Sequence, residues 1–220
     1  FVSGDVRLQY IDDAIRLLKV WIRDQGLYAA TIILPPYIYD HKFIAKQINC
    51  LWRSGFKVSV IDLNFSFDLC HFDDMYPERI WYNAKKNLRI AFTSDLMFVK
   101  STCREDDLLA YEIIRKNREG RGYPLKLSWD NVDDTSKIIA VDFFIVRNTQ
   151  LAIASAIVFH ISESVVQVVY WGDLGEYSNL KPMNFLSYKI LDYYKNLGIK
   201  TVDIGPASEK SVPNYGLAEF

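Results

Sequence analysis

The sequence predicts an α/β (α+β) protein in which helices flank mixed, largely antiparallel sheets, arranged as two related units. Residues 140–171 contain three β-rich runs with short polar segments between them, and an amphipathic helical pattern over 182–197 leads to a short strand at 200–204. Residues 11–35 repeat the order of helix, glycine, short strand and proline. We therefore expect residues 1–79 to be the C-terminal part of a first unit, incomplete at its N-terminus, and residues 80–220 to be the second unit.

The first unit is expected to alternate helices and strands. Apolar residues at helical spacing predict a helix over 11–24, which Gly26 ends. The β-rich run at 29–34 (AATIIL) stops at two prolines, because proline cannot continue a hydrogen-bonded ladder. A second helix is predicted over 41–53 and a second strand over 57–63 (KVSVIDL), and the acidic, aromatic segment 64–77 is expected to be a connection.

The second unit opens with helical patterns over 80–92 and 105–118, and Ser128 is a candidate N-cap for a short helix over 129–137. Three strands are predicted over 140–146, 151–160 and 165–171. The polar segments between these strands are short enough for antiparallel hairpins. Pro182 suits the first turn of the last helix and Gly198 suits its C′ position.

Composition limits the class of protein. Half of the residues are hydrophobic, which is enough for a substantial core, and no apolar run approaches the roughly 18–20 residues of a membrane span. The first residues lack the pattern of a signal peptide and no methionine starts the chain, so we expect a piece of a longer protein.

Cys50, Cys70 and Cys103 are unevenly spaced and indicate neither a disulfide framework nor a zinc knuckle. Free thiols and a cytoplasmic location are expected.

Charge is unevenly distributed along the chain. The net charge of −1 gives no general attraction to nucleic acid, so no DNA partner is expected. Residues 85–126, however, contain ten basic and six acidic side chains. This local excess favours a phosphate-bearing ligand, with solvated helix faces as the alternative.

Common catalytic motifs are absent from the sequence. It contains no H-E-x-x-H, no P-loop and no G-x-G-x-x-G, and His41, His71 and His160 are scattered. Cys70 and His71 are adjacent, but a nucleophile and its base meet in space rather than in sequence. A hydrolase, kinase or dehydrogenase therefore has no support, and no metal site is predicted.

The order of meander, helix and strand over 141–204 resembles the GNAT acyltransferase fold. In that fold the fourth strand diverges from its neighbour, and the next helix N-terminus faces the acyl donor. Strand amides and a helix N-terminus can donate hydrogen bonds to a carbonyl or phosphate. Members that use coenzyme A carry a Q/R-x-x-G-x-G/A pattern in this loop. Here only Gly175 is present, and Asp173 and Glu176 would repel a pyrophosphate. The resemblance therefore disfavours coenzyme A.

A series of weak motifs runs through nearly the whole chain in order: ILPPYIY (33–39), GF (55–56), IIRKNR (113–118), YWGD (170–173), MNFL (183–186), DIG (203–205) and NYGLAEF (214–220). Together they resemble the Fem-type (FemAB/FemX-like) branch of the GNAT superfamily, which consists of tandem GNAT proteins. That branch transfers amino acids from aminoacyl-tRNA to peptidoglycan precursors. A lysine that the family uses would follow Phe220, outside this chain.

The resemblance implies an acyltransferase that acts on an amine of a peptidoglycan or polysaccharide precursor of the cell envelope. No cofactor is firmly implied, and the acyl donor would be aminoacyl-tRNA or acyl-CoA. The alternatives are a CoA-dependent N-acetyltransferase of surface-sugar synthesis and a catalytically inactive GNAT-like binding module. Charged tRNA is a candidate partner.

Three residues are the catalytic candidates. Asp203 would orient the acceptor amine or take its proton, Trp171 would stack on a sugar or base, and Asn184 would bind a carbonyl. Each also has a structural reading, as a turn cap, a core aromatic and a helix cap. The candidate substrate-binding residues are Asp173 and Asn214 together with Lys85, Lys86 and Arg89, which would hold the phosphates of a precursor.

Overall fold

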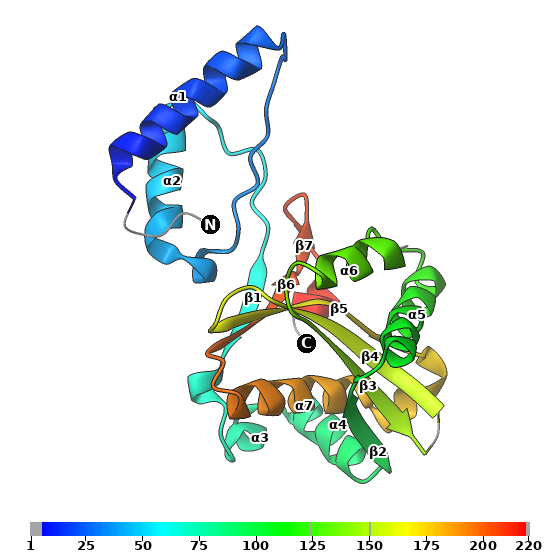
Figure 1. Ribbon diagram of the computed structural model, residues 1–220. Coiled ribbons are helices and arrows are strands. Elements are labelled where there is room, and N and C mark those ends of the chain that lie inside the picture. The colour runs from blue at the N-terminus through cyan, green and yellow to red at the C-terminus, as the bar shows by residue number, and fades with distance from the viewer. Residues whose placement is uncertain (1–5, 124, 150, 219–220) are drawn as a thin grey trace. The chain divides into compact units, whose positions relative to one another are not determined.

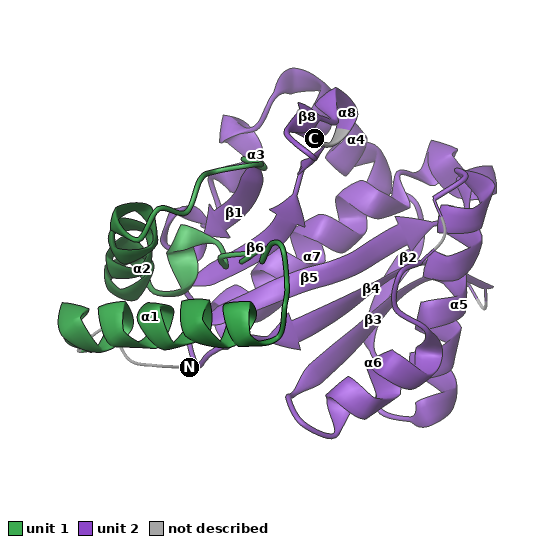
Figure 2. Cartoon of the chain, turned by 90° about the horizontal axis from the view of Figure 1, so that it is seen from above, with its two compact units in different colours: residues 1–62 green, residues 63–220 purple. Residues whose placement is uncertain are grey.

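The computed structural model describes residues 6–123, 125–149 and 151–218. The chain forms two compact units, Phe1–Asp62 and Leu63–Phe220, shown in separate colours in Figure 2. The compact units divide after residue 62, so the segment expected to be a connection lies in the second compact unit, and the predicted boundary between two GNAT-like units at residue 79 stays a prediction.

Two α-helices form the core of the first unit over its described residues, 6–62. They are α1 (Leu8–Asp24) and α2 (His41–Arg53), and the one-turn 3-10 helix η1 (Tyr37–Tyr39) precedes α2. Ile11 and Ile15 of α1 share a small core with Cys50 of α2. The helices are also joined by an ion pair between Arg53 and Asp12, with the two atoms 2.8 Å apart. Apolar spacing therefore predicted both helices correctly.

The strands predicted in this unit are wrong. Residues 29–34 and 57–63 are not strands, and none occurs in the described part of the first unit, residues 6–62. Both runs have the composition of strands, but a strand forms only where its backbone groups pair with a neighbour. The repeated order of helix, glycine and strand is therefore not confirmed, and the tandem arrangement remains a prediction.

A six-stranded sheet forms the centre of the second unit (Figure 1). Its strand order is β1-β6-β5-β4-β3-β2, and all neighbours are antiparallel except β5 and β6. The strands are β1 (Asn64–Asp68), β2 (Leu96–Lys100), β3 (Val141–Asn148), β4 (Leu151–His160), β5 (Val165–Asp173) and β6 (Thr201–Pro206). The antiparallel hairpins predicted for β3, β4 and β5 are confirmed.

Helices cover both faces of this sheet. One hydrophobic cluster includes residues of α4 (Tyr82–Phe92) and α7 (Pro182–Asn196), and the other includes residues of α5 (Arg104–Gly120) and α6 (Trp129–Ser136). Figure 1 shows the two helix pairs on opposite sides of the strands. The predicted N-cap of α6 is confirmed: Ser128 forms a capping box with Asn131.

Two strands of the six-stranded sheet, and the short pair β7 (Ser208–Glu209) and β8 (Val212–Pro213), were not foreseen. β1 lies in the segment expected to be a connection, and β2 lies between two predicted helices. The remaining elements are short: η2 (Leu69–His71), α3 (Tyr76–Arg79), η3 (Gly175–Leu180) and α8 (Tyr215–Ala218).

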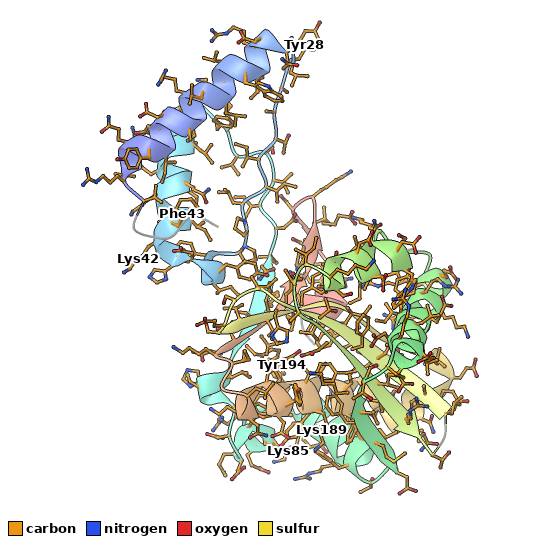
Figure 3. All side chains as sticks on the ribbon, viewed as in Figure 1. Tyr28, Lys42, Phe43, Lys85, Lys189 and Tyr194 are labelled. Carbon is orange, nitrogen blue, oxygen red and sulfur yellow. The ribbon has the colours of Figure 1, made fainter. Side chains whose placement is uncertain are left out.

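A buried polar network fixes α7 to the sheet. Tyr194 of α7 is fully buried, at the position where Figure 3 labels it between the helix and the strands. Its hydroxyl donates to Asp142 Oδ2 at 2.8 Å. Asp142 also contacts His160 Nε2 at 2.8 Å and Lys100 Nζ at 2.7 Å. Because α7 is fixed in this way, the two strands it connects are held as well.

Candidate functional site

The parallel strands β5 and β6 separate soon after they begin. Their ladder consists of the pairs Val165–Thr201, Val166–Val202 and Gln167–Asp203. Beyond Asp203, β6 continues along β1 while β5 continues along β4 to Asp173. The edge of β5 that pairs with β6 up to Gln167 therefore has no strand partner beyond that residue in the described chain. The gap that forms between the two strands is called the opening. A strand edge without a neighbouring strand can offer backbone amides to a ligand.

A β-bulge lies on β5 at this opening. Val158 pairs with Val168 and the adjacent Ile157 pairs with Tyr170, so Val169 is the extra residue. A bulge bends its strand and redirects backbone groups, and bulges are common beside active sites. Here it falls directly after the last β5–β6 pair, where the strand leaves its neighbour.

Asp203 lies at the point where the two strands part and is fully buried. Its Oδ1 accepts hydrogen bonds from Asn64 Nδ2 at 2.8 Å and from the Gly205 amide at 2.9 Å. The bond to Gly205 supports the tight turn there, where the φ of Gly205 is 81°. Asp203 thus makes the turn-capping contact that was the structural alternative, and it connects β1 to β6.

Trp171 and Asn184 lie on the two elements that follow the bulge. Trp171 is half-buried on β5 and packs against the cluster that includes α7. Asn184 is half-buried in the first turn of α7, which begins after Lys181 in a left-handed conformation (φ 57°) and Pro182. The first amides of a helix have no partner within the helix and favour negative charge.

Asp173 ends β5 in a largely buried position. Asn117 Nδ2 of α5 donates to the Asp173 carbonyl at 2.7 Å, and it lies 3.3 Å from Asp173 Oδ1. Arg121 approaches the same carboxylate at 3.8 Å. Burial raises the pKa of Asp173, and the charge of Arg121 only partly opposes this shift. A carboxyl with a raised pKa is suited to exchange protons with a substrate.

Sequence reasoning did not assign a role to the α5 residues that adjoin this strand. The motif at 113–118 meets the motif at 170–173: Asn117 contacts Gly172 and Asp173, and the Arg118 guanidinium lies 5.7 Å from the centre of the Tyr170 ring. The two motifs were visible in the sequence, but their proximity depends on how α5 crosses the sheet.

The other predicted binding residues lie on two different parts of the second unit, α4 and the segment just beyond β6. Lys85, Lys86 and Arg89 are on α4, which packs against α7, and Lys85 forms an ion pair with Glu78. Asn214 is exposed between β8 and α8, and its amide donates to the Ala207 carbonyl at 2.8 Å. The last two residues of its motif lie outside the described residues.

The cysteines and histidines do not form a nucleophilic site among the described contacts. Cys50, Cys70 and Cys103 are free. In the absence of a bound cation, a hydrogen bond with Asp68 raises the pKa of the Cys70 thiol, which disfavours a thiolate nucleophile. His160 contacts Asp142, as expected for a structural histidine. No helix in the described part of the chain is both long and apolar enough to cross a bilayer.

Sequence comparisons and structural comparisons give different results. No model of a known protein family matches the sequence, and no curated protein matches it. Among solved structures, FemX is similar with a TM-score of 0.69 and 12% identity, over 96% of this chain and 72% of that one. The C-terminal domain of a putative lysylphosphatidylglycerol synthetase from Agrobacterium fabrum has a TM-score of 0.66 and 13% identity, over 95% of this chain and 62% of that one.

A third structure, L-PGS from Bacillus licheniformis, has a TM-score of 0.56 and 12% identity, over 74% of this chain and 50% of that one. The chain thus spans less than two thirds of the length of two of these three structures. Together with the diverging strands, these similarities show that the chain has a Fem-like, GNAT-type fold, as its motifs predicted. At such identities the likeness shows the fold alone.

Proposed function

We propose that this protein is a Fem-like acyltransferase that transfers an aminoacyl or acyl group to an amine of a cell-envelope precursor. The observation that carries the proposal is the bulged end of β5, which leaves β6 after Gln167 and leads into the N-terminus of α7. This arrangement places backbone amides without strand partners beside a helix N-terminus. Such donors can stabilise the oxyanion of acyl transfer.

The reaction requires an activated acyl group and a neutral amine. The amine nitrogen attacks the carbonyl carbon of the ester, and the resulting oxyanion accepts hydrogen bonds from the amides of β5. The bond to the leaving oxygen then breaks, and the amine proton passes to a base or to solvent. No covalent enzyme intermediate is needed, so positioning supplies much of the rate.

Two carboxylates have different roles in this proposal. Asp173 is the proposed proton acceptor, because burial raises the pKa of its carboxyl. Asp203 is already held by Asn64 and Gly205, so it positions the strands at their point of divergence. Trp171 offers an aromatic face for the substrate, and Asn184 offers an amide side chain at the start of α7.

The loop between β5 and α7 favours aminoacyl-tRNA over coenzyme A as the donor. Residues 174–181 contain the single glycine Gly175 and form the short 3-10 helix η3. Asp173 and the exposed Glu176 place carboxylates where a pyrophosphate would bind. Acyl-CoA remains the second candidate donor, and the acceptor is a peptidoglycan or polysaccharide precursor, whose phosphates Lys85, Lys86 and Arg89 of α4 and Asn214 would help to hold.

Transfer assays test the proposal directly. Purified protein is incubated with a UDP-linked muramyl peptide and aminoacyl-tRNA, and product is measured by mass spectrometry. Trp171→Ala and Asp173→Asn are expected to lower the rate at least about tenfold. Trp81→Ala, which changes a tryptophan that is 88% exposed, is the matched control and should leave the rate unchanged.

Two outcomes would contradict a Fem-like transfer that uses aminoacyl-tRNA as its donor. Stabilisation by stoichiometric acetyl-CoA together with acetyl transfer would favour the CoA-dependent N-acetyltransferase. Binding of the precursor without turnover of any donor would instead favour an inactive GNAT-like binding module. If both site variants transfer at the parental rate, the protein catalyses the reaction but does so at another site.

A further inference from the structure

Three different metal-ligand types meet in the turn that follows β1. One carboxylate oxygen of Asp68, the Cys70 thiol and a ring nitrogen of His71 all lie within 4.8 Å of one another. All three residues are exposed. The turn is at the beginning of β6 and the end of α7, on elements other than the β5 bulge and the α7 N-terminus used by the proposed reaction.

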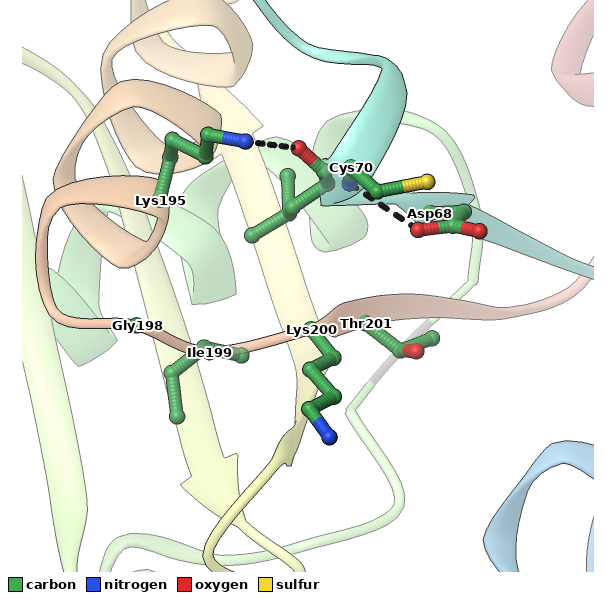
Figure 4. Close-up of a pocket in the computed structure, with 8 residues that line it drawn as sticks. Asp68, Cys70, Lys195, Gly198, Ile199, Lys200 and Thr201 are labelled. Carbon is green, nitrogen blue, oxygen red and sulfur yellow. Dashed lines mark hydrogen bonds between the residues drawn. The ribbon is translucent and has the colours of Figure 1, made fainter.

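The backbone of this turn is held in place before any ligand binds. The Leu69 amide donates to the Lys200 carbonyl at 2.8 Å, and Lys195 Nζ donates to the Leu69 carbonyl at 2.7 Å. The Cys70 amide donates to Asp68 Oδ1 at 2.9 Å, and Figure 4 shows the last two of these bonds. Arg79 donates to the His71 carbonyl at 2.6 Å. Ordering the turn around an ion would therefore cost little additional backbone entropy.

The spacing of the three side chains suits a small cation. Ligand atoms bound tetrahedrally at 2.0–2.3 Å lie about 3.3–3.8 Å apart, so exposed side chains need to move by only about 1 Å to reach this geometry. Asp68 Oδ1 accepts the Cys70 amide, and its second carboxylate oxygen can act as the ligand. Nearby positive charges are Lys195, whose ammonium is engaged with the Leu69 carbonyl, Arg79, which forms an ion pair with Asp73, and Lys200 on the wall of the adjoining hollow.

The chemistry of the ligands selects the class of ion. Thiolate and imidazole favour Zn²⁺ and its analogue Co²⁺, whereas Mg²⁺ and Ca²⁺ prefer sets made only of oxygens. We propose that Asp68, Cys70 and His71 form a binding site for Zn²⁺, with the fourth position taken by water. Asp68 and Cys70 also line a surface hollow of about 560 Å³, which leaves room for an anionic group at that position.

Co²⁺ is a suitable probe because its bond to a thiolate produces a charge-transfer absorption and its tetrahedral complexes absorb strongly in the visible range. The reduced, untagged full chain is treated with chelator and titrated with Co²⁺. We expect one ion per chain, a thiolate charge-transfer band, and displacement by Zn²⁺. Cys70→Ser should abolish the band, and His71→Gln should weaken binding at least about tenfold.

The chain provides matched controls for both variants. Cys103→Ser changes another exposed free cysteine and His41→Gln another exposed histidine, and both should bind Co²⁺ like the parent protein. Far-UV circular dichroism confirms that each variant is folded. Absence of the band from the parent protein, or its persistence in Cys70→Ser, would overturn the proposal. Equal loss in Cys103→Ser would also overturn it.

Discussion

At the scale of single residues, the close packing of Asn117 on Gly172 sets the geometry at the end of β5. A Cβ at position 172 would lie 2.9 Å from Asn117 Cγ. Gly172→Ala should therefore displace Asn117, disturb its bond to the Asp173 carbonyl and lower the free energy of unfolding by roughly 1–3 kcal/mol. Urea denaturation measures this change. Gly175→Ala is the control, because a Cβ there meets nothing within 4 Å. Equal stability of the two variants would contradict the packing argument.

Asp142 is the residue whose loss should cost the most stability through polar contacts. Its carboxylate is 6% exposed and contacts Lys100, His160 and Tyr194. Asp142→Asn leaves these groups without an anionic partner and should lower the free energy of unfolding by roughly 2–4 kcal/mol. Asp134→Asn removes an ion pair whose carboxylate is 72% exposed, and it should change stability by less than about 0.5 kcal/mol.

The same pair of variants tests the pH dependence. Burial alone would raise the pKa of Asp142, but hydrogen bonds from His160, Lys100 and Tyr194 outweigh it and hold the pKa below its usual value. A lowered pKa in the folded state means that the stabilisation is present above the unfolded value of about 3.9 and is lost as the pH falls. Between pH 6 and pH 3, the free energy of unfolding should therefore fall more steeply with decreasing pH for the parent protein than for Asp142→Asn. Parallel curves would contradict this.

At the scale of elements, the capping box of α6 is a local signal that the structure confirms. Ser128 Oγ accepts from the Asn131 amide at 3.2 Å. Ser128→Ala should destabilise the protein by about 1 kcal/mol, because the Asn131 amide at the helix start loses its acceptor. Thermal unfolding measures the loss. Ser136→Ala, at the other end of α6, removes a hydroxyl that donates only to the Asp133 carbonyl and should have a smaller effect. An effect of Ser136→Ala as large as that of Ser128→Ala would argue against the cap.

Element prediction succeeded where the signal was local and failed where it depended on a partner. Apolar periodicity and the flanking Pro182 and Gly198 were sufficient for α7. Alternation in residues 57–63 predicted a strand that is absent, whereas the sequence NFSFD, with polar residues at both ends, is strand β1 because β6 pairs with it. Strand composition describes a surface that fits a sheet, not the presence of a neighbour.

At the scale of the whole molecule, the two units differ in how their backbone groups are paired. Residues 29–34 and 57–60 have strand-like sequences but belong to no helix or strand, whereas β4 pairs on both edges with β3 and β5. Hydrogen exchange read by mass spectrometry should therefore be fast in residues 29–34 and 57–60 and slowest in β4. Protection of residues 29–34 to the level of β4 would show that this run has a strand partner after all.

The sequence by itself determined the longer helices α1, α2, α4, α5, α6 and α7, but not α3 or α8. It also determined the three-stranded meander and the loop that departs from the glycine pattern of coenzyme A binding, because these depend on neighbouring residues. Its motifs also predicted a Fem-like fold, which the similarity to FemX confirms. Only the tertiary structure decided that the 113–118 and 170–173 motifs meet, that Asp203 connects β6 to Asn64, and that Asp68, Cys70 and His71 gather in one held turn. Contacts between distant segments depend on strand pairing and helix crossing, which composition and spacing do not encode locally.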